Sequence, residues 1–353
     1  DQTLKSALEE RINFSQENVS ATIFKVLEDM DFDNIIIKGA VLYFTSNNGK
    51  TENLYRLDLA TNLLERLIVN TKIDKIQKVQ SVYNPNMYGK YIVFNDLSGS
   101  PGPLRDAVKS KIIICDLESG KKDTVDRTEN ALFQPDIWGT NIIWKEGSDF
   151  VHTLYSYDIL KKNREKIGYL MNPIKRPKIY KDIVVFESAT ATPVVSYYNL
   201  ATGTEVAMPR ESAFDSQESP SIYDKKIVFA DDRNGNWDIY LFDLENEQLT
   251  QITNNTADQK NPMIYQDLIV WEDYRNQNSD IYLYYLEDET EIQISNSTDD
   301  EWSPSIFGGL VAWKSGTRKI NENDLYVYII PQLSYYQEIH NVSETNTSVT
   351  EII

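Results

Sequence analysis

A short apolar segment that ends in an aromatic residue recurs seven times along this chain of 353 residues. The terminal aromatic residues are Phe44, Phe94, Trp144, Phe186, Phe229, Trp271 and Trp313. Successive copies lie about 42 to 50 residues apart, a period typical of repeats that each form one supersecondary unit. Seven copies of this length predict a β-propeller in which each copy forms one blade.

The segments around each aromatic residue predict four strands per copy. In one copy these are Ser219-Pro-Ser-Ile-Tyr, Lys226-Ile-Val-Phe, Asp238-Ile-Tyr-Leu-Phe and Leu249-Thr-Gln-Ile-Thr. The second strand is apolar at successive positions, as expected when both faces of a strand are covered. The fourth strand alternates between apolar and polar residues, which suits an outer edge. We therefore predict an all-β, seven-bladed propeller of four-stranded antiparallel blades; the alternative, an open solenoid, needs polar capping repeats that are not visible.

The two ends of the chain do not follow the repeat. Residues 1–33 have apolar residues at helical spacing, namely Leu4, Leu8 and Ile12, and then Ile23, Phe24, Leu27 and Met30. This spacing predicts a short helical N-terminal extension, with a strand that closes the last blade as the alternative. We assign the propeller to residues 34–341 and a polar C-terminal tail to residues 342–353.

One segment of the repeat resembles a known family. Residues 230–244, Ala-Asp-Asp-Arg-Asn-Gly-Asn-Trp-Asp-Ile-Tyr-Leu-Phe-Asp-Leu, followed by Leu-Thr-Gln-Ile-Thr at 249–253, resemble the TolB-type propeller repeat. The resemblance is close over residues 215–328 and looser over 34–214, and it is nearest in look to archaeal cell-surface members. That family includes surface and periplasmic proteins that bind other proteins, propellers attached to serine peptidases, and some polysaccharide lyases. It therefore implies the fold and leaves the activity open.

The charge of the chain limits its partners. Lys and Arg number 35 against 54 Asp and Glu, so the net charge is −19. Such a chain is not expected to bind nucleic acid through phosphate contacts, or to attach to anionic membrane surfaces. Apolar segments are also too short to insert directly into a membrane. We expect a protein or a cell-surface polymer as the partner.

Motifs for catalysis or metal binding are scarce. The chain has two histidines, His152 and His340, and one cysteine, Cys115, which lies in an apolar strand and is expected to be buried and inert. No Gly-x-Ser-x-Gly or Cys-x-x-Cys motif occurs. Asp232, Asn234 and Asn236 match the first ligands of a calcium loop, but the sixth position is Trp where that loop needs Gly. We predict a hairpin turn capped by Asp and Asn side chains, with no cofactor; a bound calcium ion is the alternative.

Acidic residues gather in the loops of the last three blades. Loops between the second and third strands should emerge on the same face as the loops that join successive blades. On this face we predict a binding surface of acidic and aromatic residues formed by Asp231, Asp232, Trp237, Glu272, Asp273, Tyr274, Asp299, Asp300, Glu301 and Trp302. Asp258 and Asp300 each stand four residues before a proline, which indicates a repeated structural turn.

Glycosylation signals bear on the compartment. Asn254 and Asn296, each in an Asn-x-Ser/Thr motif, fall in predicted loops between blades and are candidate N-glycosylation sites. We expect an extracellular or cell-surface protein, with the periplasm as the alternative. The predicted function is non-catalytic binding through the acidic loop face. Two alternatives are a carbohydrate-active enzyme, a glycoside hydrolase or lyase that uses carboxylates at the channel mouth, and a structural tile of a surface assembly.

Overall fold

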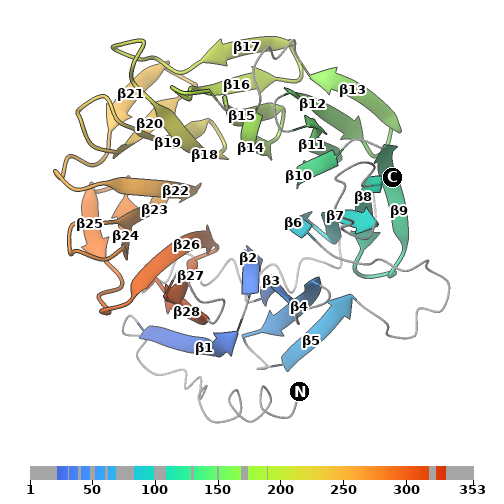
Figure 1. Ribbon diagram of the computed structural model, residues 1–353, viewed down its shortest axis with the longest axis horizontal. Coiled ribbons are helices and arrows are strands. Elements are labelled where there is room, and N and C mark those ends of the chain that lie inside the picture. The colour runs from blue at the N-terminus through green and yellow to red at the C-terminus, as the bar shows by residue number, and fades with distance from the viewer. Residues whose placement is uncertain are drawn as a thin grey trace.

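A computed structural model describes most of the chain between residues 22 and 330. The described residues are 22–30, 32–38, 41–47, 52–59, 63–68, 83–98, 109–128, 131–148, 151–167, 174–188, 190–317 and 323–330. They form seven four-stranded antiparallel sheets that surround a central axis (Figure 1). The predicted seven-bladed propeller is therefore confirmed.

In each of blades 1 to 6, four consecutive strands run from the axis outward. Blade 1 comprises β2 (Phe32–Lys38), β3 (Val41–Asn47), β4 (Glu52–Asp58) and β5 (Leu63–Ile68). Blade 2 comprises β6 (Tyr83–Tyr88), β7 (Tyr91–Ser98), β8 (Lys109–Asp116) and β9 (Lys122–Thr128). Blade 3 comprises β10 (Ala131–Trp138), β11 (Asn141–Ser148), β12 (Val151–Asp158) and β13 (Asn163–Ile167).

The second half of the ring repeats this plan. Blade 4 comprises β14 (Ile174–Tyr180), β15 (Ile183–Ser188), β16 (Val195–Asn199) and β17 (Thr204–Ala207). Blade 5 comprises β18 (Gln217–Tyr223), β19 (Lys226–Asp231), β20 (Asp238–Asp243) and β21 (Gln248–Gln251). Blade 6 comprises β22 (Gln259–Tyr265), β23 (Leu268–Asp273), β24 (Asp280–Tyr285) and β25 (Thr290–Gln293). Blade 7 takes β26 (Asp300–Phe307), β27 (Leu310–Gly316) and β28 (Asn323–Ile329) from the end of the chain.

The fourth strand of blade 7 comes from the N-terminus. Strand β1 (Thr22–Met30) pairs antiparallel with β28, with Thr22 opposite Ile329 and Lys25 opposite Tyr326. The prediction of a helix at Ile23 to Met30 is therefore wrong. The alternative, a strand that closes the last blade, is what forms. The physical reason is that β28 would otherwise leave its outer backbone groups unpaired, and this pairing overrides a weak helical pattern. The remaining residues of the expected extension, 1–21, and the tail at 342–353 lie outside the described residues.

The core consists of apolar layers between neighbouring blades. Trp271 packs on Val228 and Ile239 of blade 5, whereas the adjacent Val270 packs toward blade 7. Both faces of β23 are thus covered, as the continuous apolar pattern predicted. Trp144, Trp271 and Trp313 are all fully buried.

Each innermost strand carries one β-bulge near its start. A non-glycine residue with φ between 46° and 56° occupies it in every blade: Asn34, Asn84, Gln134, Arg176, Ser219, Asn261 and Ser303. The strand register shifts at the same place in all seven blades. We refer to these seven as the bulge residues. A bulge turns its side chain out of the regular pleat, so these residues set the inner edge of one propeller face.

Candidate functional site

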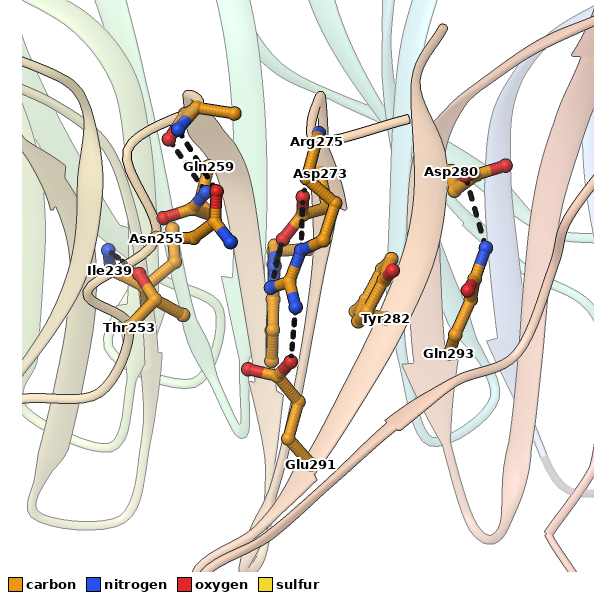
Figure 2. A network of polar contacts seen from close by, with 12 residues as sticks. Ile239, Thr253, Asn255, Gln259, Asp273, Arg275, Asp280, Tyr282, Glu291 and Gln293 are labelled. Atoms are coloured by element: carbon orange, nitrogen blue, oxygen red, sulfur yellow. Dashed lines mark hydrogen bonds and ion pairs between the residues drawn. The ribbon is translucent and has the colours of Figure 1, made fainter. Parts of the chain in front are cut away.

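Two equivalent loops of blades 5 and 6 are each built around a buried Asp–Arg pair. In blade 6, Arg275 Nη2 lies 2.6 Å from Asp273 Oδ2, and Arg275 Nε donates to Asp273 Oδ1 at 2.8 Å. The guanidinium also lies over the Tyr282 ring, 4.3 Å from its centroid, and donates to Glu291 (Figure 2). Asp273 is fully buried, and its hydrogen bonds raise the pKa of Arg275. The pair therefore fixes the turn that follows β23.

Blade 5 repeats the arrangement with Asp231, Arg233 and Tyr240. Arg233 Nη2 lies 2.6 Å from Asp231 Oδ2, and the guanidinium lies 4.6 Å from the centroid of the Tyr240 ring. Arg233 also donates to the carbonyl of Pro209 at 2.8 Å, and so ties this turn to the loop that connects blades 4 and 5.

A second pair of buried carboxylates, Asp238 and Asp280, receives side-chain amides. Asp280 accepts from Asn276 at 2.7 Å. It also accepts from Gln293 at 3.1 Å (Figure 2). Burial raises the pKa of Asp280, and the amide donors oppose that rise. Asp238 accepts from Asn234 and Gln251 in the same way. The amide groups are thus committed to holding the loops.

Carboxylates also join neighbouring blades. Glu272 accepts from the backbone N–H of Ser303, the bulge residue of blade 7, at 2.9 Å. Glu187 accepts from the N–H of Ser219, the bulge residue of blade 5, at 2.8 Å. Asp258 accepts from Trp237 N, and Asp300 from Ser279 N, at equivalent positions of successive blades. The repeated structural turn predicted from the Asp and Pro spacing is therefore confirmed.

The predicted calcium-like segment of blade 5 is a capped turn. Asp232 accepts from Ser216 N at 2.6 Å, and Gly235 N donates to the Asp232 carbonyl. Asn234 donates to the Tyr240 hydroxyl, and Asn236 donates to the carbonyls of Asn255 and Ala257. Asp232 thus caps a backbone amide as the hairpin interpretation predicted, whereas both Asn side chains act as hydrogen-bond donors instead of capping amides. Within the part of the chain that the structure describes, no three His, Cys, Asp or Glu side chains converge as a metal-binding group.

The ten residues of the predicted binding face differ widely in accessibility. Four are buried, namely Asp231, Glu272, Asp273 and Glu301. Five are partly buried, namely Asp232, Trp237, Tyr274, Asp300 and Trp302, and Asp299 is exposed. Four of the seven carboxylates of the set are thus inside the protein and cannot reach a partner directly. The sequence pattern does not distinguish an acidic residue that solvates a loop from one that holds it together.

Glu301 differs from the other buried carboxylates. It occupies the position that Gln259 takes in blade 6, since the two pair with Ser315 and Asp273 at equivalent places. Among the described residues, one of its carboxylate oxygens, Oε2, has no hydrogen-bond partner. Burial raises the pKa of Glu301 to about 7, and the nearby charge of Asp280 adds to the effect.

Sequence reasoning missed an exposed aromatic residue on the same face. Phe214, in the loop between β17 and β18, is 85% exposed. Its loop is held by Asp215, whose Oδ2 accepts from Glu211 N at 3.1 Å and Ser212 N at 2.6 Å. No repeat pattern identifies this loop, because it is specific to one blade junction.

The structure also locates most of the predicted glycosylation, cysteine and histidine positions. Asn254 and Asn296 are exposed, as a glycosylation acceptor must be. Cys115 is buried with a free thiol. The backbone of His152 lies in β12, and His340 is outside the described residues. In the described residues, no helix has the length and apolar character needed to cross a membrane.

The fold is shared with several solved structures at low sequence identity. The β-propeller domain of the Trilobed protease from Pyrococcus furiosus matches 86% of this chain and 94% of its own length, with a TM-score of 0.62 and 12% identity. That domain has an open velcro topology, whereas β1 here pairs with β28 and closes the ring. An oligogalacturonate lyase in complex with manganese matches 90% of this chain and 98% of its own, with a TM-score of 0.61 and 13% identity.

A third similar structure is the acylaminoacyl peptidase of Pyrococcus horikoshii, with a TM-score of 0.61 and 10% identity. The match covers 85% of this chain and 52% of the peptidase, so this chain spans about half of that protein. No protein-family model matches the sequence, and no curated protein matches it. At these identities the similarity establishes the fold alone: the chain is a seven-bladed, four-stranded β-propeller whose ring is closed by strands from its two ends.

Proposed function

We propose that this chain is a non-catalytic propeller that binds a protein or a surface polymer through the loop face of blades 5 to 7. The observation that carries the proposal is an exposed aromatic side chain on a fixed loop. Phe214 is 85% exposed, and its loop is held by Asp215 and joined through the Pro209 carbonyl to Arg233. A large apolar side chain left in water on a rigid loop gains most when a partner covers it.

The construction of this face also favours binding. The Asp–Arg pairs hold the blade 5 and 6 turns in one conformation, so little conformational entropy is lost when a partner binds. Trp237, Tyr274 and Trp302 are partly exposed in the same loop set, and aromatic residues of this kind are enriched in interfaces. Because most of the carboxylates are paired internally, recognition depends more on these aromatic residues than on an acidic surface. Asp232, Asp299 and Asp300, which are not fully buried, supply the remaining negative charge.

The compartment and the family are parts of the same proposal. The TolB-type repeat over residues 215–328, nearest in look to archaeal cell-surface members, supports a role outside the cytoplasm. The exposure of Asn254 and Asn296 agrees with an extracellular or cell-surface location. Similar structures include a protease propeller, a peptidase and a lyase, so the fold is compatible with both binding and enzymatic proteins.

A matched pair of exposed apolar residues provides the test. Phe214→Ala alters the loop face, whereas Leu160→Ala alters an equally exposed side chain in the β12–β13 turn on the opposite face. Cell-surface extract would be passed over each immobilised variant, and the amount of every retained component would be compared with that on the unmodified protein. We expect Phe214→Ala to lose a component that Leu160→Ala retains. Equal retention by both variants would refute the loop-face proposal.

A further inference from the structure

Equivalent positions of the seven blades show where this propeller departs from its own repeat. Among the bulge residues, six are neutral and polar, and only Arg176 in blade 4 is charged. Since the fold forms the same bulge with Asn, Gln or Ser, it does not require a charge at this position. The residue that precedes the bulge is also cationic here, Lys175. Blade 4 therefore carries two adjacent cations at the start of β14, in the inner rim, by which we mean the ends of the innermost strands on the loop face.

Three cations share one buried carboxylate at this rim. Arg176 Nη1 donates to Glu187 Oε2 at 2.9 Å, and Lys175 Nζ lies 4.0 Å from Glu187 Oε1. Lys145 of the neighbouring blade 3 belongs to the same group, because it interacts electrostatically with both Lys175 and Glu187. Glu187 is 1% exposed, whereas the side chains of Lys175 and Arg176 are 53% and 44% exposed. The charge of Glu187 cannot neutralise all three cations.

Lys145 is a buried lysine, as is Lys314 at the equivalent position of blade 7, but Lys145 has another cation beside it. It is buried, and its ammonium makes one hydrogen bond in the described part of the chain, to the Ile174 carbonyl at 3.3 Å. Burial lowers its pKa, the Lys175 charge lowers it further, and Glu187 opposes both. A buried amine next to another cation is costly unless an anion offsets it. The fold supplies only part of that offset.

Glu218 adds a hydrogen-bond acceptor to the group. It is the blade 5 counterpart of Lys175 and interacts electrostatically with Arg176, Glu187 and Lys260. Burial raises its pKa, and within the described residues its carboxylate has no hydrogen-bond partner. This rim thus offers surplus positive charge together with an acceptor that is available to hydroxyl donors.

We propose that the inner rim formed by β11, β14 and β18 binds a sugar acid, that is, a carboxylate that also carries hydroxyl groups. Lys175 and Arg176 bind the ligand carboxylate, with Lys145 behind them, and Glu218 accepts from a ligand hydroxyl. A sulfate ion has no hydroxyl donor for Glu218, and an inorganic phosphate carries its O–H groups on the same centre as its charge, so it cannot place a donor away from the charged oxygens. An acidic peptide side chain provides the carboxylate alone. The net charge of −19 disfavours long polyanions, so the ligand is a short or terminal uronate unit.

This site is separate from the loop-face binding proposed above. Its residues lie on the first and second strands of blades 3 to 5, and Phe214 is not among them. The two proposals can therefore fail independently. If Phe214→Ala abolished retention of a surface component but left uronate binding intact, the two sites would be distinguished directly.

Isothermal titration of the full chain with a glucuronic acid trimer tests the proposal. The methyl-esterified trimer, which lacks the charge, and a glutamate tripeptide serve as comparison ligands. We expect saturable binding of the acid trimer, with an affinity that falls as salt is added. The affinity for the ester should be lower by about tenfold or more. Absence of saturable binding, or equally tight binding of the tripeptide, would overturn the sugar-acid assignment.

Charge-matched variants locate the site. Arg176→Gln is expected to weaken binding of the acid trimer about tenfold or more. Lys181→Gln, in the same blade but in the β14–β15 turn on the opposite face, removes one exposed charge and should leave binding unchanged. Lys175→Gln, at a largely exposed side chain, provides a second test should Arg176→Gln fail to fold as judged by circular dichroism. Binding that is unaffected in a folded Arg176→Gln or Lys175→Gln protein would refute the site.

Discussion

Replacing Arg275 by alanine should measure what holds the loop face together. The guanidinium makes two hydrogen bonds to Asp273, a third to Glu291, and a contact with the Tyr282 ring. Asp273 is fully buried, so the substitution leaves a carboxylate inside the protein with its cationic partner removed. The remaining donors are the Trp271 indole, at 3.0 Å, and the backbone N–H of residue 275.

The size of the effect follows from the burial of the pair. Removing one partner of a buried ion pair costs about 3 to 5 kcal/mol. Because the Arg275 side chain is 24% exposed and water screens part of the interaction, we expect the lower end, about 3 kcal/mol. An unfolding entropy of about 2.1 cal/mol/K per residue converts this loss into a fall in Tm of about 4 °C for a chain of this length.

Calorimetric and circular-dichroism melts of three proteins would check the value. Arg210→Ala is the matched control, since Arg210 is exposed and its guanidinium makes a single hydrogen bond, to the Asp215 carbonyl. The Tm of Arg210→Ala should equal that of the unmodified protein. Adding Asp273→Asn to Arg275→Ala should recover part of the loss, because the buried charge is then removed. If Arg275→Ala melted together with Arg210→Ala, the pair would not stabilise the loop as argued.

Three further measurements address other parts of the molecule. Burial raises the pKa of Glu301 from 4.5 to about 7, so between these values the folded protein keeps a proton that the unfolded chain loses. The free energy of unfolding should therefore fall as pH rises from 4.5 to 7, and Glu301→Gln should reduce the accompanying fall in Tm. Burial also raises the pKa of the Cys115 thiol, so a thiol reagent should label the unfolded protein and not the folded one. Deleting residues 1–30 removes β1, and limited proteolysis should then cleave blade 7 first.

The repeat made the fold predictable because the same residue types serve the same role in every blade. The aromatic residue that ends the second strand fills an interface between blades, and its spacing gave the blade count. Closure of the ring was harder to predict, since only one blade needs a strand from elsewhere. The apolar residues of 22–30 fitted a helix as well as a strand until β28 supplied a pairing edge.

The accessibility of the loop residues was not predictable for a different reason. Asp231 and Asp299 both adjoin turn-rich sequence, yet Asp231 is buried against Arg233 and Asp299 is exposed. Whether a carboxylate is buried depends on a cation that the fold places two residues away or on a neighbouring blade. Charge counted along a sequence therefore overestimates the charge that a loop face presents to a partner.

The same reasoning indicates how function can be read from a propeller. Where a side-chain type recurs at equivalent positions, hydrogen bonding within the fold can explain it, as Glu272 and Glu187 illustrate by accepting from the next bulge residue. Arg176 departs from six neutral counterparts, and although its guanidinium pairs with the buried Glu187, the side chain stays 44% exposed and can also contact a ligand. The difference between blades, rather than their common pattern, is thus the better guide to a ligand, and the comparison of Arg176→Gln with Lys181→Gln tests that principle on this chain.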